Sequence, residues 1–74
     1  MTTARKINSM IDEAAKQGQN VYGYNLIINP IGLLSKKDYA IRVVRAETRD
    51  GEVRVRKTDG TWCRISPFST FDTR

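Results

Sequence analysis

The stretch YAIRVVRAETRDGEVRVRKTDGTWCRI, residues 39–65, alternates apolar and polar residues around two turn signals. The first signal, Asp50-Gly51, is typical of two-residue hairpin loops in which both central residues take a positive φ. In the hairpin that it predicts, apolar residues face apolar residues, and two of the three polar pairs carry opposite charges. The predicted partners are Arg49–Glu52, Thr48–Val53, Glu47–Arg54, Ala46–Val55 and Arg45–Arg56.

The second turn, Thr58-Asp59-Gly60, decides whether the two faces of the sheet stay separate. A two-residue loop at Asp59-Gly60 would set Val55 opposite Arg64 and mix the faces. A three-residue loop with Gly60 in the left-handed conformation keeps them apart, so we expect this loop. Its predicted partners are Val53–Ile65, Arg54–Arg64, Val55–Cys63 and Arg56–Trp62.

The predicted meander has one apolar face, which must be covered, and one charged face. Since Ile41 and Val43 fall out of phase with Val44 and Ala46, we expect a β-bulge or sharp bend near Val43. The apolar face holds Val44, Ala46, Val53, Val55, Cys63 and Ile65. The charged face holds Arg45, Glu47, Arg49, Glu52, Arg54, Arg56, Trp62 and Arg64.

Residues 3–17 predict the one helix, because apolar residues recur there at three- and four-residue spacing. Thr2 or Thr3 can cap its start and Gly18 can end it. Arg5 and Lys6 stand in the first turn, where the helix dipole disfavours cations. Either these charges cost a few tenths of a kcal/mol without further meaning, or they serve something other than the helix.

The remaining segments are read from shorter patterns. Residues 21–29 predict a strand that places Tyr22 and Tyr24 on the core face with Leu26 and Ile28; the alternative for the tyrosines is a stacking platform for bases. Residues 31–34 predict a short strand or irregular core segment, and residues 35–38 a loop. After a turn at Ser66-Pro67, we expect residues 67–74 to form a tail whose Phe68 and Phe71 fold back over the core.

The fold class that these elements predict is α+β. The 74 residues form one small domain, with a helix at 3–17, a β meander at about 39–66 and the tail. One N-terminal helix followed by a small, strongly bent antiparallel sheet, closing on RVRKTDGTWCRISPF, resembles the small barrels of SH3-like and Sm-like domains. The resemblance covers most of the chain as a pattern of elements without a family motif, so it implies an architecture and no function. An open three- or four-stranded sheet packed by the helix is the alternative.

The counts of cysteine and histidine exclude several kinds of site. With a single cysteine and no histidine, the chain cannot form an internal disulfide or a structural zinc site, and it lacks the commonest general base. We therefore expect no metal, no cofactor and no enzymatic activity. There is no apolar leader and no apolar run long enough to span a membrane, so we expect a cytoplasmic protein without a membrane partner.

Thirteen Lys and Arg against eight Asp and Glu give a net charge of +5, which favours anionic partners. Arginine bonds phosphates bidentately and tryptophan stacks on bases, so the charged face predicts a nucleic-acid site, for DNA or RNA. The candidate residues are Arg45, Arg49, Arg54, Arg56, Trp62 and Arg64.

Two other interpretations remain open. The charged face can be an ordinary solvated surface, with Trp62 lying under Arg56 or buried by the C-terminal phenylalanines. The protein can also be a small accessory factor or inhibitor, of the phage or plasmid type, that docks on an acidic surface of a larger host protein; a homo-oligomer is a further option. A continuous basic stripe would favour nucleic acid, whereas an apolar patch with a charged rim would favour a protein partner.

Overall fold

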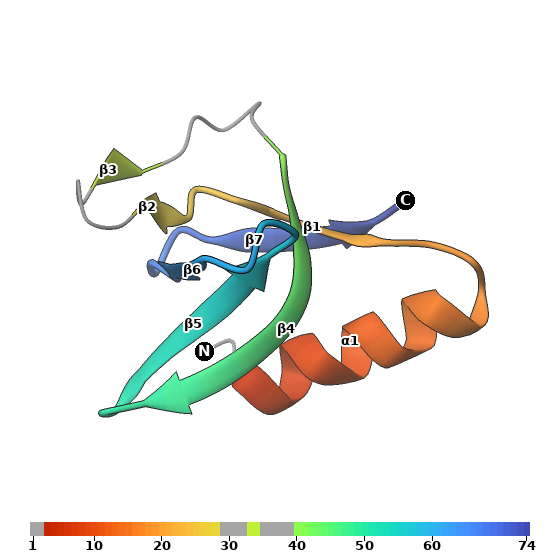
Figure 1. Ribbon diagram of the computed structural model, residues 1–74, viewed down its shortest axis with the longest axis horizontal. Helices are drawn as coiled ribbons and strands as arrows, with labels where there is room; N and C mark the ends of the chain where they lie inside the picture. The colour runs from red at the N-terminus through yellow and green to blue at the C-terminus, as the bar shows by residue number, and fades with distance from the viewer. Residues whose placement is uncertain (1–2, 29–32, 35–39) are drawn as a thin grey trace.

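The computed structural model describes residues 3–28, 33–34 and 40–74. These residues form one N-terminal helix and a single antiparallel sheet (Figure 1), which confirms the predicted α+β fold. The elements are α1 (Ala4–Lys16), β1 (Val21–Tyr24), β2 (Ile27–Ile28), β3 (Leu33–Leu34), β4 (Ile41–Arg49), β5 (Glu52–Lys57), β6 (Trp62–Arg64) and β7 (Thr70–Thr73). The predicted segments at 31–34 and 35–38 lie outside the described residues, apart from β3.

Helix α1 begins and ends within one residue of the predicted bounds, 3–17. The Thr3 side chain caps it by accepting a hydrogen bond from the Lys6 amide at 3.2 Å, and Gly18 follows its last turn with a φ of 69°. Its apolar stripe buries Ile7 and Ala14 against the sheet, mainly on β4. Figure 1 shows the helix lying beside the lower part of β4.

The register of β4, β5 and β6 is the predicted one throughout. All five predicted β4–β5 pairs form, and so do Arg54–Arg64, Val55–Cys63 and Arg56–Trp62 between β5 and β6. The Ile65 amide donates to the Val53 carbonyl at 3.2 Å. Positive φ values at Asp50 and Gly51, and of 87° at Gly60, confirm the two-residue and three-residue loops.

The predicted bulge forms, but it overturns the placement of Val44. Val43 is opposite Lys57 and Arg45 is opposite Arg56, so Val44 is the extra residue in β4. Val43 and Ala46 are buried, with exposed fractions of 2% and 3%, and the two residues between them lie outside the core. Val44 is 36% exposed, so the prediction that it belongs to the apolar face is wrong.

The predicted first strand is broken in two at Asn25, whose φ is 56°. This left-handed residue changes the phase of the alternation, so that Val21 and Leu26 both enter the core although five positions separate them. Tyr22 and Tyr24 are therefore only half-buried on the other face. The prediction that they share a core face with Leu26 is wrong.

The C-terminal residues form a strand where the sequence predicts a tail. The turn at Ser66-Pro67 is closed by the Ser69 amide, which donates to the Ser66 carbonyl at 3.0 Å, and β7 then pairs with β1. Phe71 packs against the core as expected, over Gly23, where a Cβ atom would lie 2.9 Å from its ring. Phe68 is 70% exposed, so the prediction that it covers the core is wrong.

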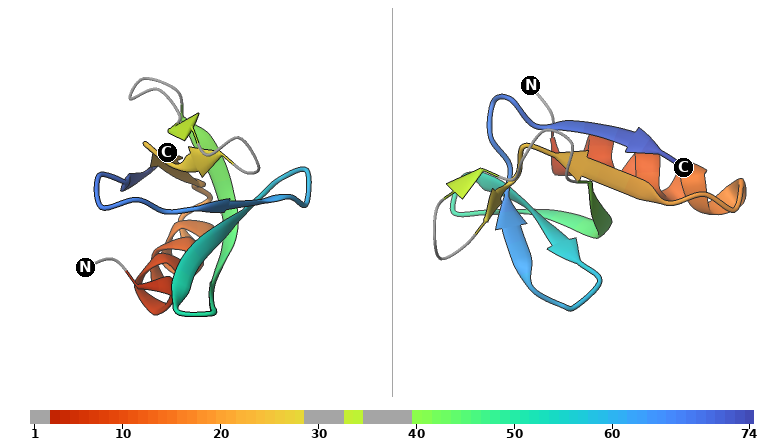
Figure 2. Two further views of the ribbon diagram at one scale, coloured as in Figure 1. Left: turned by 90° about the vertical axis from the view of Figure 1, so that its left-hand side faces the viewer. Right: turned by 90° about the horizontal axis from the view of Figure 1, so that it is seen from above.

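The sheet is strongly bent but open. Its order is β3-β2-β6-β5-β4-β1-β7, so β1 and β2, which only Asn25 and Leu26 separate in the chain, have β6, β5 and β4 between them. The sheet must curl around the core to satisfy both, as Figure 2 shows. In the part of the chain that the structure describes, the end strands β3 and β7 do not pair, so the small barrel is not closed. The core holds Ile7, Ala14, Val21, Leu26, Val43, Ala46, Val55 and Cys63.

Candidate nucleic-acid interface

All six predicted site residues lie on β4, β5 and β6, on the face opposite the core. Ala46, Val55 and Cys63 are buried, and side chains alternate between the two faces of a strand. The positions that alternate with these three therefore point outward. They bring the predicted residues together in cross-strand rows, of which the one nearest the bulge is Arg45, Arg56 and Trp62.

This row, called the basic row below, carries two unpaired charges. Arg45 and Arg56 are both exposed, and neither makes an ion pair or a side-chain hydrogen bond with any described residue. Strands in a sheet lie about 4.8 Å apart, so the two arginines start from neighbouring positions, with Trp62 next in line. Like charges directly opposite one another are destabilising, and a phosphate between them would remove that repulsion.

Arg54 is held in place by two neighbours. Its Nε donates to Glu47 Oε1 at 2.8 Å, and its Nη2 lies 2.6 Å from the same oxygen. Its Cζ lies 4.9 Å from the centroid of the Trp62 ring. Trp62 is thus half-buried under Arg54, its diagonal neighbour, and not under Arg56, which was one of the two alternatives for it.

The two remaining arginines differ in their surroundings. Arg64 Nη1 lies 3.7 Å from Glu52 Oε1, so this charge is partly balanced. Arg49 is exposed beside the first turn and has no ion-pair partner among the described residues. Of the five predicted arginines, Arg45, Arg49 and Arg56 therefore remain available to a ligand, while Arg54 and Arg64 are engaged by carboxylates.

A second cluster, which the sequence pattern did not predict, brings the cation of Arg74, just after β7, against two aromatic rings of β1. Arg74 Cζ lies 5.3 Å from the Tyr22 ring centroid and 5.8 Å from that of Tyr24. The Tyr24 hydroxyl donates to Asp72 Oδ2 at 3.0 Å and accepts from Arg74. Desolvation and the hydrogen bond to Asp72 raise the pKa of the Tyr24 hydroxyl above its ordinary value. Alternation read from Val21 instead of Leu26 would have placed both tyrosines outside.

Other kinds of site find little support in the described residues. Nowhere in 3–28, 33–34 and 40–74 do three or more His, Cys, Asp or Glu side chains gather as metal ligands, and no helix there is long and apolar enough to cross a membrane. Cys63 is fully buried, and this burial raises the pKa of its thiol.

Comparison of the chain with protein-family models, with curated proteins and with solved structures finds no match. The case for a function therefore rests on the geometry of the surface.

Proposed function

We propose that this protein is a small cytoplasmic nucleic-acid-binding module that acts by binding and not by catalysis. The basic row carries the proposal: two exposed, unpaired guanidinium groups on adjacent strands, next to the single tryptophan of the chain. Guanidinium groups bond phosphate oxygens in a bidentate manner, and the net charge of +5 attracts a polyanion from a distance.

Single strands are the class of nucleic acid that this surface suits best. Bases of a single strand are free to stack on aromatic rings and on guanidinium planes. Arg54 and Trp62 already stack on one another, and Glu47 fixes Arg54 from the other side, so the platform is ordered before a ligand arrives. Phosphates would then contact Arg45 and Arg56, with Arg49 at the margin.

An acidic protein surface is the other partner that a net positive charge attracts. The basic row favours nucleic acid over it, because the two free arginines adjoin a stacking platform and because Val44 is the one exposed apolar residue of β4. Protein interfaces, in contrast, have an apolar centre from which charged residues are depleted.

The fluorescence of Trp62 tests the proposal directly, since no other tryptophan contributes. We would titrate the protein with single-stranded DNA and RNA of about 15 nucleotides, and with a duplex, at about 50 and 200 mM salt. The expected result is saturable quenching by single strands that weakens at the higher salt. No change in fluorescence or anisotropy at low salt would refute the proposal and leave the protein-docking function.

A further inference from the structure

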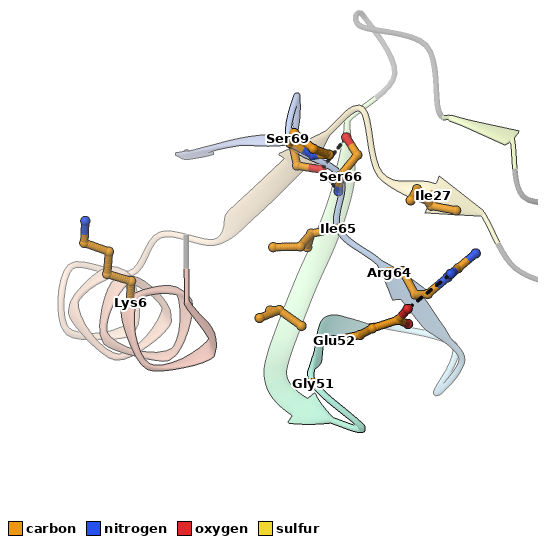
Figure 3. Close-up of a pocket in the computed structure, with 10 residues that line it drawn as sticks. Lys6, Ile27, Gly51, Glu52, Arg64, Ile65, Ser66 and Ser69 are labelled. Atoms are coloured by element: carbon orange, nitrogen blue, oxygen red, sulfur yellow. Dashed lines mark hydrogen bonds and ion pairs between the residues drawn. The ribbon is translucent and has the colours of Figure 1, made fainter. Parts of the chain in front are cut away.

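A pocket of about 670 Å³ opens where β5 begins and β6 ends, beside the first turn of α1 (Figure 3). Val53, Ile65 and Pro67 supply apolar surface, and Lys6, Glu52 and Arg64 supply charge. Its volume lies within the range of ligand sites in proteins. The pocket contains no residue of the basic row and shares only Arg64 with the six candidate nucleic-acid residues.

Lys6 is the charged residue of the pocket whose position the fold explains least. It stands in the first turn of α1, where the helix dipole disfavours a cation, and it makes no ion pair with any residue that the structure describes. Figure 3 shows it on the helix side of the pocket, across from Ile65. An anionic group bound in the pocket would give this charge the partner that the fold does not.

The apolar part lies between Lys6 and a second charged group. Val53 and Ile65 are only partly buried, although both pack against the core, so their remaining surface is open to the pocket. Arg64 and Glu52 form their ion pair on the other side of the strand ends (Figure 3). The rim therefore has two cations and one carboxylate, which favours a ligand with negative charge.

The wall beside Ile65 is fixed. The hydroxyls of Ser66 and Ser69 both donate to the Asn25 carbonyl, at 3.0 and 2.9 Å, which holds the turn at Ser66-Pro67 on the chain between β1 and β2. A preformed wall reduces the entropy that a ligand loses on binding.

We propose that this pocket is a docking site for an extended segment of a partner protein in which an aliphatic side chain is adjacent to a carboxylate. The aliphatic group would lie on Val53, Ile65 and Pro67, and the carboxylate would pair with Lys6. Charged groups stand on both sides of the strand ends, so a peptide that crosses them fits better than a compact molecule. Nucleic acid has no aliphatic group of this kind and would leave the apolar surface unfilled.

Amide chemical shifts measured by NMR test the proposal on the whole protein. The probe is a short capped peptide containing Leu-Asp between glycines, with Leu-Lys and Ser-Asp peptides for comparison. The Leu-Asp peptide should shift the amides of Lys6, Gly51, Val53 and Ile65 in a saturable manner. The Ser-Asp peptide should bind at least tenfold more weakly, because it lacks the aliphatic group.

Lys6→Glu is the matching protein variant, with Arg5→Glu as the control of equal charge on the same turn. An acidic residue suits the start of a helix, so neither change should unfold the protein. Lys6→Glu should weaken binding of Leu-Asp by about fivefold and improve binding of Leu-Lys, whereas Arg5→Glu should alter neither by more than about twofold. Equal shifts from all three peptides, or equal effects of both variants, would overturn the proposal. Octanoate has an aliphatic chain and a carboxylate but no peptide backbone, so shifts of the pocket amides with octanoate alone would also overturn it.

Discussion

The side chain of Asn8 in α1 bonds to both main-chain groups of Ala46 in β4. Its Nδ2 donates to the Ala46 carbonyl at 2.9 Å, and its Oδ1 accepts from the Ala46 amide at 2.9 Å. Ala46 comes just after the bulge, beyond the point where β1 pairs with β4. The side-chain amide of Asn8 thus makes the hydrogen bonds that a neighbouring strand would make at Ala46. These bonds connect the helix to the bent part of the sheet.

Asn8→Ala should destabilise the protein by about 2 kcal/mol, because two part-buried main-chain groups lose their partners at about 1 kcal/mol each. Urea denaturation measures the change. Ser9→Ala, at the exposed neighbouring position, is the control and should change stability by less than about 0.5 kcal/mol. Equal stability of the two variants would show that solvent replaces the Asn8 amide.

Gly60→Val should cost more stability than Gly51→Asn. Both glycines have a positive φ, but a β-branched residue is strained there while asparagine is tolerated. Nothing blocks a side chain at Gly60, since the nearest atom to a Cβ there, Arg56 Nη2, is 4.0 Å away. The cost should therefore be backbone strain of about 1 to 2 kcal/mol, seen as a lower Tm. Equal Tm values would contradict the assignment of the two turns.

Cys63 should be inert in the folded protein, because burial keeps its thiol protonated. The folded pKa lies above the ordinary value of 9.0, so stability from this group is complete below pH 9 and is lost as pH rises toward the folded pKa. Relative to Cys63→Ala, wild-type stability should fall by up to about 1.4 kcal/mol per pH unit in that range. Denaturation curves at several pH values measure this; rapid alkylation at pH 8 without denaturant would contradict it.

Glu47→Gln should strengthen binding to single strands. The change removes the carboxylate that engages Arg54 and adds one available cation to the face, so the slope of log affinity against log salt should steepen by about 0.7. Glu13→Gln is the matched control, since Glu13 pairs with Lys16 on the exposed side of α1. If Glu13→Gln steepens the slope equally, net charge and not the position of Arg54 is responsible.

The hairpin registers could be predicted from the sequence because each is fixed by a turn glycine and by one buried face. A slip of one residue at Gly60 would bury Arg64, so a single register satisfies both conditions. The same argument located the bulge near Val43 but not the direction of Val44, because alternation says nothing about which residue a bulge leaves unpaired.

The tyrosines and β7 could not be predicted because their placement depends on contacts distant in the chain. The phase change at Asn25 follows from a positive φ that a non-glycine residue rarely adopts, and β7 is defined by its pairing with β1 more than by its own four residues. On the candidate site, the pattern placed all the arginines on one face. It could not show that Arg54 turns toward Glu47 and Trp62, because strand alternation sets the face of a side chain and not its rotamer.

The salt dependence of binding by the double variant Arg45→Ala/Arg56→Ala tests the central claim most directly. Both side chains are exposed, and removing them relieves repulsion, so the fold should persist. The control, Arg5→Ala/Lys16→Ala, removes two charges from the exposed part of α1. For single-stranded DNA, the basic-row variant should lower the slope of log affinity against log salt by about 1.4, at about 0.7 per contact, while the control leaves it nearly unchanged. Equal reductions in both variants would show that binding follows net charge alone and would contradict the assignment of the basic row.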